Sequence, residues 1–244
     1  MEDLFISQKR EDVFSPLLEW GILGVEEIGE LSGYQGNNRN LKKLILRAEN
    51  DGILNSFIHK MSSRKFIYLT RKAHQHLSVT PWNVKEDIKM HDSILNAVLY
   101  RFSKMDFVSL HKINNQNLEF NQGIFADGVD PDGMIRAKRN DRVLNVAIEI
   151  ELTRKNSTAI TEKFKKYHRN TSFDVAIYFF NSLRVMAAYS KYYEEIKKFL
   201  KISNDEQKLI FCCSKRLAEK DFNPLEAEIR NNGSFKSLKE FFNA

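Results

Sequence analysis

The sequence contains little cysteine, proline and glycine, and each shortage excludes a class of protein. Its two cysteines, Cys212 and Cys213, are adjacent, so they provide no disulfide framework and favour a reducing cytoplasm. With 10 glycines and 4 prolines among 244 residues, the chain is neither collagen-like nor largely disordered. No apolar run reaches the roughly 18–20 residues of a membrane-spanning helix. We therefore expect a cytoplasmic globular protein without membrane insertion.

The chain does contain enough apolar sequence for a core, together with an uneven distribution of charge. Apolar residues make up 42%, and the length allows one large domain or two small ones. The net charge is +6, but residues 1–32 carry −6, residues 33–90 carry +7 and residues 91–244 carry +5. A basic stretch beside an acidic one indicates a nucleic-acid-binding surface, with an ordinary solvated surface as the alternative.

The first eighty residues have the order of elements found in a winged helix-turn-helix. Apolar spacing predicts three helices, at 14–22, 25–31 and 37–50. Two short extended runs follow, at 53–59 and 65–69, and Thr70 can cap a further helix. Three helices and a basic hairpin predict a DNA-binding domain over residues 1–80, although many winged helices only bind protein or dimerise.

The basic residues of this segment fall on the elements that would contact DNA. We expect the start of the third helix to meet base edges in the major groove, through Asn37, Asn38 and Arg39. The rest of that helix would lie near phosphates, through Lys42, Lys43 and Arg47. The hairpin would contact the DNA backbone or the minor groove, through Lys60, Arg64 and Lys65. These assignments make double-stranded DNA the expected partner.

A short linker that contains Pro81 leads to a second domain, which we place at residues 84–244. It begins with an amphipathic helix over 84–102 that carries His91 and Asp92. Strands are expected at 107–110, 118–120, 143–152, 175–180 and 209–213, with helices between several of them. This alternation predicts a mixed α/β sheet flanked by helices.

Three carboxylates are predicted to converge on two strands of this domain. Glu149 and Glu151 are two residues apart in an otherwise apolar strand, so they point to the same face. Burying both is costly without a cation or hydrogen bonds, and Asp132 at the start of the partner strand could reach the same place. Such a set of oxygen ligands suits Mg²⁺ or Mn²⁺, which could activate water. Lys155 or Lys163 could balance the charge and orient the nucleophile.

The pattern of Pro131-Asp132, a gap, and then Glu149-x-Glu151 at the end of an apolar strand resembles the PD-(D/E)xK nuclease superfamily. Glu151 occupies the position where that superfamily usually has lysine. Related families tolerate this departure, and some carry the lysine on the following helix. The departure argues against simple hydrolytic cleavage.

The order of motifs along residues 14–215 is similar to that of the replication-relaxation superfamily, and within it to MobC-type relaxases of mobilisable plasmids. That resemblance rests on the winged helix, the His91-Asp92 helix, Asp130-Pro131-Asp132-Gly133, Glu149-x-Glu151-x-Thr153, and a helix with Lys163 and Tyr167. It implies a metal-dependent relaxase that nicks one strand at a plasmid transfer origin. It also implies locally melted DNA as substrate, and a mobilisation accessory protein and a coupling protein as partners.

The resemblance implies a metal site of Asp132, Glu149 and Glu151, with Asp92 as an additional acidic ligand and Lys155 and Lys163 as charge-balancing groups. Two further residues have competing interpretations. His91 could be a base or a ligand, or an ordinary helix histidine. Tyr167, four residues after Lys163 on one helical face, could attack a phosphodiester, but a packed or DNA-stacking tyrosine is favoured.

Two other functions stay open on the sequence. A restriction- or transposon-type endonuclease of the same fold would cut both strands. A non-enzymatic DNA-binding regulator of plasmid replication would keep sequence-specific binding, and its Glu149 and Glu151 would be a degenerate site that takes up no metal. The basic surface suits all three functions, so charge does not discriminate among them.

Overall fold

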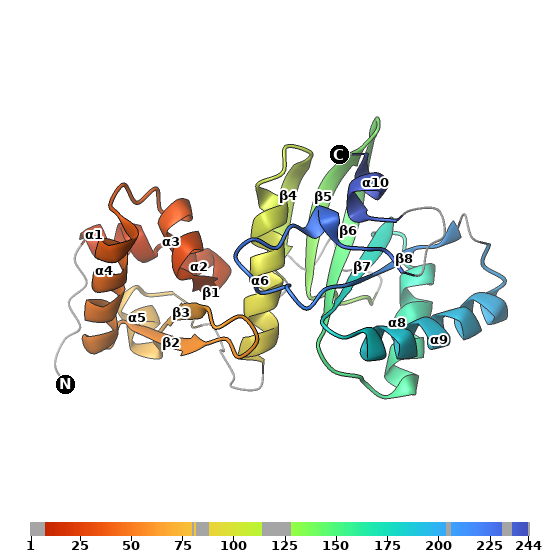
Figure 1. The fold of residues 1–244 in the computed structure, drawn as a ribbon, viewed down its shortest axis with the longest axis horizontal. Helices are drawn as coiled ribbons and strands as arrows, with labels where there is room; N and C mark the ends of the chain where they lie inside the picture. The colour runs from red at the N-terminus through yellow and green to blue at the C-terminus, as the bar shows by residue number, and fades with distance from the viewer. Residues whose placement is uncertain are drawn as a thin grey trace. The chain divides into compact units, whose positions relative to one another are not determined.

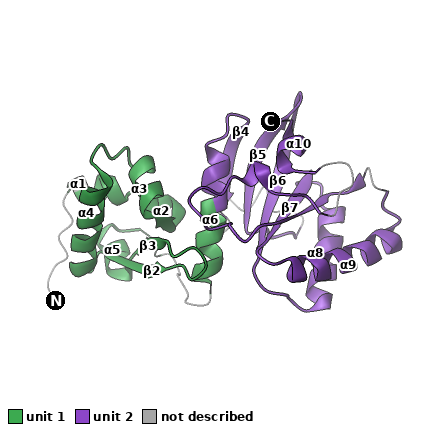
Figure 2. Cartoon of the chain, viewed as in Figure 1, with its two compact units in different colours: residues 1–97 green, residues 98–244 purple. Residues whose placement is uncertain are grey.

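The protein is a mixed α/β structure that divides into two compact units, residues 1–97 and 98–244 (Figures 1 and 2). The computed structural model describes residues 8–79, 81, 88–113, 128–203, 206–230 and 236–243. The division lies within α6 (Lys89–Ser103), whereas the sequence places the boundary at 80–84, mostly outside the described residues. No described helix is both long enough and apolar enough to cross a bilayer.

The first unit contains short helices and a small antiparallel sheet with the strand order β1-β3-β2. Its elements are α1 (Gln8–Phe14), α2 (Pro16–Trp20), β1 (Ile22–Gly24), α3 (Val25–Leu31), α4 (Asn38–Asn50), β2 (Leu54–Ile58), β3 (Lys65–Leu69) and α5 (Arg71–His76). The three strands are joined in register, with Ile22 opposite Tyr68 and Leu54 opposite Leu69. The elements predicted over 25–69 are therefore present, each within a residue or two of its expected bounds.

Local capping explains where two helices of this unit begin. The Asn37 side chain accepts a hydrogen bond from the Asn40 backbone N–H at the start of α4, and Thr70 does the same for Ala73 in α5. Along α4, Leu41, Ile45 and Ala48 form the buried stripe. The cap predicted at Thr70 is confirmed, and the outer face of α4 is left to solvent.

The predicted helix over 14–22 is wrong at both ends, because Phe14 is the last residue of α1 and only Pro16–Trp20 forms α2. Gly21 has φ +70°, a left-handed conformation that ends α2, and Ile22 then enters β1. Ile22, Leu23 and Gly24 pair with β3, a strand more than 40 residues later in the chain. A three-residue strand is too short for apolar spacing to reveal, so Ile22 was read as part of the helix.

The second unit is built on a five-stranded sheet with the order β4-β5-β6-β7-β8. Its elements are the C-terminal part of α6, β4 (Val108–Ile113), β5 (Gly133–Arg139), β6 (Arg142–Glu151), α8 (Ser157–Arg169), β7 (Val175–Phe180), α9 (Leu183–Leu200), β8 (Leu209–Cys213), a 3-10 turn at Pro224–Glu226 and α10 (Leu238–Phe242). β4, β5 and β6 are antiparallel, whereas β6, β7 and β8 are parallel. The strand expected at 118–120 lies outside the described residues.

Helices cover both faces of this sheet (Figure 1). On one face, α8 and α9 pack through an aromatic-rich core that includes Phe164, Tyr189 and Phe211. On the other face, Phe102 of α6 lies against Phe179 and against Phe242 of α10. Along β6 the alternation of side chains places Ala147, Glu149 and Glu151 on the α8 side. The fold thus aims the two predicted glutamates at a helix rather than at water.

Candidate active site and nucleic-acid interface

The three predicted carboxylates are brought together where β5 begins and β6 ends. Asp132 directly precedes β5, and its Oδ2 accepts a hydrogen bond from the Ile150 backbone N–H at 2.8 Å. Ile150 lies between Glu149 and Glu151 in the last residues of β6. The antiparallel pairing of Gly133 with Ile148 holds this register. The hairpin therefore fixes Asp132 beside both glutamates, as the sequence predicts.

Glu149 is the most buried charged group of this site, with no exposed surface. Its Oε2 accepts from the Lys163 Nζ at 2.6 Å, and its Oε1 accepts from the Tyr167 hydroxyl. Lys163 and Tyr167 lie four residues apart on α8, so one face of that helix serves both oxygens. Burial, together with the nearby Asp132 carboxylate, raises the pKa of Glu149 to about 8 against the opposing effects of Lys163 and Tyr167.

The pKa values of Lys163 and Tyr167, the two partners of Glu149 on α8, are both raised. Burial by itself lowers the pKa of Lys163, but the carboxylates of Glu149, Asp132 and Glu151 outweigh it, so the pKa is raised. Burial, with Glu149 beside it, raises the pKa of Tyr167 well above its ordinary value. Tyr167 is therefore a protonated hydrogen-bond donor to Glu149, and this agrees with the packed interpretation rather than with a nucleophile.

Glu151 and Lys155 form the outer part of the site. The Lys155 Nζ donates to the Glu151 Oε1 at 2.8 Å, and the lysine side chain is 46% exposed while that of Glu151 is 2% exposed. The neighbouring Arg154 donates to the Tyr192 hydroxyl and lies 5.6 Å from that ring's centroid. The segment after β6 therefore has two exposed cations, Arg154 and Lys155, of which Lys155 is paired with a buried carboxylate.

A divalent cation is compatible with the donor chemistry of this site. Carboxylate oxygens are the ligands that Mg²⁺ and Mn²⁺ prefer, and the Asp132 carboxylate is close enough to contribute to the raised pKa of Glu149. The hydroxyl of Tyr178, paired in register with Glu149 on β7, is buried without a hydrogen-bond partner. Within the described part of the chain, however, no three His, Cys, Asp or Glu side chains are grouped closely enough to hold a metal. Lys163 and Lys155 are paired with Glu149 and Glu151 in this structure, so a bound metal would have to compete with these two lysines.

His91 and Asp92 lie on the part of α6 that belongs to the first unit. The His91 Nδ1 lies 3.0 Å from the Asp92 Oδ1, and Asp92 is 7% exposed. This pair has the geometry of an ordinary helix histidine with an adjacent carboxylate. The role of Asp92 as an additional ligand and that of His91 as a base stay predictions.

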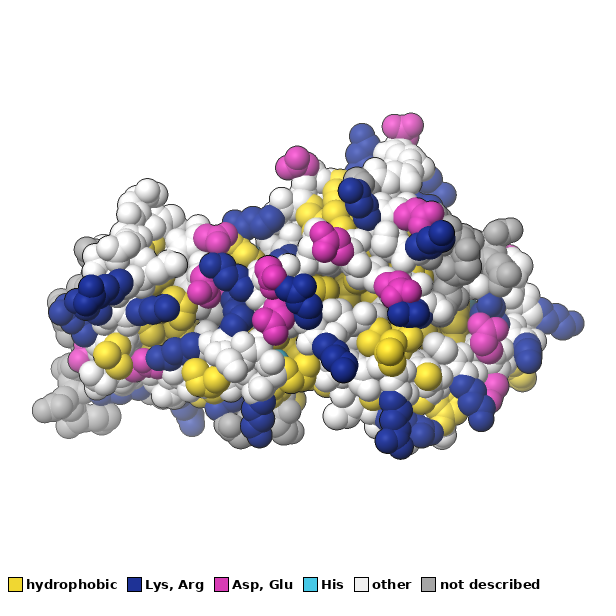
Figure 3. Space-filling model, viewed as in Figure 1, with side chains coloured by type: hydrophobic (Ala, Val, Ile, Leu, Met, Phe, Trp, Pro, Cys, Tyr) yellow, Lys and Arg dark blue, Asp and Glu magenta, His cyan; other side chains and the backbone are white. Residues whose placement is uncertain are grey.

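The outer face of α4 carries the cations predicted to contact DNA. Arg39, Lys42, Lys43 and Arg47 are all exposed, as are Asn37 and Asn38 at the start of the helix. In the described structure none of these four cations has an ion-pair partner. Figure 3 shows dark-blue side chains over the part of the first unit that contains α4. This face therefore presents uncompensated positive charge on a rigid helix.

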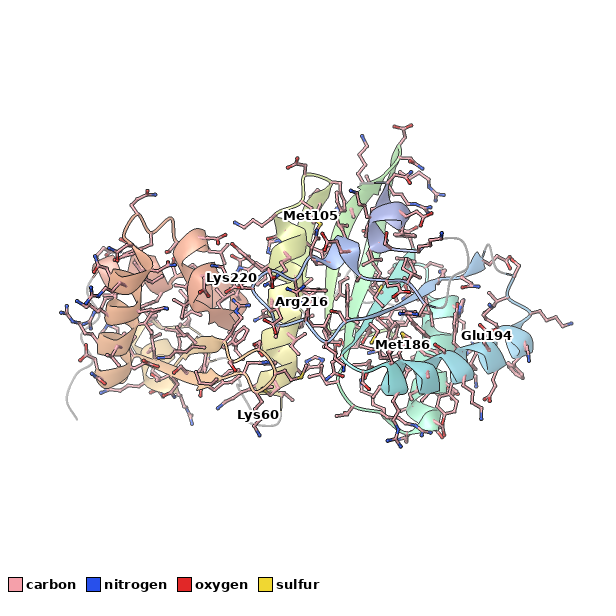
Figure 4. The ribbon with its side chains drawn as sticks, viewed as in Figure 1. Lys60, Met105, Met186, Glu194, Arg216 and Lys220 are labelled. Atoms are coloured by element: carbon pink, nitrogen blue, oxygen red, sulfur yellow. The ribbon has the colours of Figure 1, made fainter. Side chains whose placement is uncertain are left out.

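The basic residues of the β2–β3 hairpin differ from one another. Lys60 is exposed and lies at the β2–β3 connection (Figure 4). Arg64 is instead 10% exposed, and its guanidinium donates to both oxygens of buried Glu27, at 2.6 and 2.5 Å. Lys65 Nζ lies 2.7 Å from Glu49 Oε2. Arg64 and Lys65 are therefore bound to carboxylates of the same unit, and we leave them out of the proposed DNA contacts.

Sequence reasoning misses two residues of these sites, Glu27 and Tyr178. The sequence shows Glu27 only as one acid of the acidic segment, whereas the structure buries it on α3, where it needs a cation. Gly24 leaves room for the Glu27–Arg64 pair, because a Cβ at this position would collide with both side chains. Tyr178 is the one hydroxyl-bearing residue in the apolar strand 175–180, next to the strand of Glu149.

No protein-family model matches the chain, and neither a curated protein nor a solved structure matches it. What the two sites can do is therefore argued from their own residues.

Proposed function

We propose that the protein is a DNA-binding, metal-dependent nuclease of the relaxase type, which nicks one strand at a plasmid transfer origin. In this proposal the first unit is a winged helix-turn-helix that selects the DNA. The second unit is a PD-(D/E)xK-like domain that cleaves it. The sequence resemblance suggests the plasmid context, and the arguments below concern DNA binding and cleavage.

The exposed cations of α4 support the DNA-binding half of the proposal. Four described helices, α1 to α4, precede the β2–β3 hairpin, and α4 and the hairpin belong to the same unit. Four unpaired cations on one helix are suited to phosphate contacts, and Asn37, Asn38 and Arg39 at its N-terminus are suited to base edges. The cost of holding these charges together in the free protein would be relieved by a polyanion.

The observation that carries the cleavage half is the placement of three carboxylates and a lysine on adjacent elements. Asp132 is hydrogen-bonded to the backbone between Glu149 and Glu151, and Lys163 reaches Glu149 from α8. Carboxylates with a raised pKa, such as Glu149 at about 8, occur preferentially at functional sites, although structural ion-pair networks also produce them. An acid with a raised pKa beside a partly exposed lysine is an arrangement expected of a reaction centre.

The chain's own residues then have definable roles. To hold Mg²⁺ or Mn²⁺, the carboxylates of Asp132, Glu149 and Glu151 would have to move closer together than they lie in this structure. The ion, when bound, would polarise the phosphate and favour deprotonation of water. Tyr167 donates a hydrogen bond to Glu149 and fixes the orientation of its carboxylate. Lys163, whose side chain is 25% exposed, can place its ammonium against a phosphate oxygen while it remains near Glu149.

One observation favours a second candidate, the non-enzymatic DNA-binding regulator. Lys163 and Lys155 already neutralise Glu149 and Glu151 at 2.6 and 2.8 Å. An acidic pair that lysines compensate can be a structural element of the core. A regulator would bind DNA through α4, and replacement of Asp132 would leave its DNA binding unchanged.

A nicking assay tests the proposal. Supercoiled plasmid that carries the DNA neighbouring this gene is incubated with the protein and Mg²⁺ or Mn²⁺, beside Asp132→Ala and the matched control Asp130→Ala, an exposed aspartate two residues earlier. We expect open circles from the wild type and from Asp130→Ala. Asp132→Ala should be slower by more than about a hundredfold, because loss of a ligand costs more than loss of a group behind it.

The other outcomes assign the alternatives. Linear product from the wild type would favour a restriction- or transposon-type endonuclease. A gel shift without cleavage under either metal would favour the regulator. Equal nicking by wild type and Asp132→Ala would remove Asp132 from the site.

A further inference from the structure

One side chain on the basic face of α4 is apolar. Leu46 is 55% exposed, although the buried stripe of the helix, Leu41, Ile45 and Ala48, lies on the opposite side. It follows Arg39 by seven residues and Lys42 and Lys43 by four and three, so it shares their face. Leu46 is therefore at the centre of the charged face and is not part of the core.

The exposed apolar residues of the first unit are concentrated on the proposed docking elements. Among its described residues the large apolar side chains that are exposed are Leu46 on α4, Ile58 at the end of β2 and Met61 in the β2–β3 connection. In Figure 3 yellow apolar surface lies beside dark-blue side chains in this part of the first unit. A helix that faced only water would gain nothing from leucine at this position, where lysine or glutamate has equal helix propensity.

The chemistry of the DNA major groove offers Leu46 a specific partner. Of the four bases only thymine carries a methyl group on the groove edge, and apolar side chains discriminate by contact with it. Cations on both sides of Leu46 would bind phosphates and hold the helix at a fixed depth. Polar Asn38 and Arg39, both about two turns earlier in the helix, would meet hydrogen-bonding base edges instead.

We propose that Leu46 is a specificity-determining residue that packs against the C5-methyl group of one thymine in the DNA site. This inference rests on the proposed DNA binding by the first unit, and it does not depend on whether the second unit cleaves. It makes an A·T pair the preferred pair at one position of the site, flanked by backbone contacts.

Selection from a random duplex library, followed by substitution of single atoms, tests the inference. The full chain and Leu46→Ala are each used in EDTA to select binding sequences, and every thymine in the wild-type site is then replaced in turn by deoxyuridine, which lacks only the methyl group. We expect one replacement to weaken wild-type binding about fourfold, as for loss of one buried methyl. The same replacement should leave binding by Leu46→Ala unchanged.

Leu183→Ala is the matched control, because Leu183 is also 55% exposed but lies on α9 in the second unit. It should respond to deoxyuridine as the wild type does. Alanine is the best helix former, so thermal unfolding of Leu46→Ala should match the wild type.

Each other outcome overturns the inference in a distinguishable way. If deoxyuridine weakens wild type and Leu46→Ala equally, or weakens neither at any position, then Leu46 does not read a methyl group. If the protein selects no sequence but still shifts DNA, Leu46 is not a specificity determinant and the proposed DNA binding stands. If no duplex is bound at all, both this inference and the DNA-binding half of the proposed function fail.

Discussion

The lysines of α4 and of α8 occupy helices of the same length but have opposite surroundings. Lys42 and Lys43 are exposed and have no ion-pair partner in the described structure, whereas Lys163 lies 2.6 Å from a fully buried carboxylate. Both helices have 13 residues and a cationic face. The difference teaches that the number of positive charges does not identify a binding surface. What identifies it is whether the protein already supplies the counter-charges.

The largest expected effect comes from removing a cation that is compensated. Lys163→Met leaves Glu149 buried without its ion-pair partner, and breaking such a pair costs about 3 kcal/mol of unfolding free energy. Chemical denaturation at pH 9, where Glu149 is ionised and the pair is charged, measures this loss of unfolding free energy. The control is Lys165→Met on the same helix, whose partner Glu162 is 53% exposed and whose loss should change stability little. Equal stability of the two variants would mean that the Lys163–Glu149 contact contributes nothing to the fold.

Removal of uncompensated cations should leave stability alone and weaken DNA binding instead. Arg39→Ala combined with Lys42→Ala removes two proposed phosphate or base contacts. We expect about a tenfold or greater loss of affinity and a salt dependence shallower by about 1.8 in the log–log slope. Fluorescence anisotropy over a range of salt concentrations measures both. Lys65→Ala, which removes a cation paired with Glu49, is the control that should keep the wild-type slope. An unchanged slope in the double variant would exclude α4 as the interface.

The smallest expected effect is a difference in pH dependence at Glu149. Its pKa is raised by burial from the ordinary range to about 8, so the folded state binds a proton more tightly than the unfolded state. Stability from this group is therefore complete below about pH 4.5 and is lost as the pH rises through about 8. Glu149→Gln removes the titrating group. The difference in Tm between wild type and this variant, measured in EDTA from pH 5 to pH 9, should move steadily in favour of the variant by several degrees. A difference that stays constant with pH would show that Glu149 is not a raised-pKa acid.

Much of the architecture follows from local sequence, and the exceptions have physical causes. Strands 175–180 and 209–213 were predicted at their observed bounds, because continuous apolar runs in a parallel sheet leave little ambiguity. The convergence of Asp132 with Glu149 followed from one hairpin. The partner of Arg64 did not, because the Glu27–Arg64 pair joins residues 37 positions apart and depends on how the sheet and α3 pack. β1 was missed since three residues carry no periodicity.

The two kinds of strand pairing in the second unit imply an order of events during folding. β5 and β6 are joined by two residues, Asn140 and Asp141, with Asn140 at φ +54°, so their contacts close a short loop. The parallel pairing of β6 with β7 requires the whole of α8 to cross over first. Because local contacts form faster, we expect the hairpin to carry Asp132 and both glutamates into place while they are still hydrated. Water would then be excluded from the site in one late step, when α8 docks on the sheet. Glu149 would take up a proton in that same step, so proton uptake would measure the docking of α8.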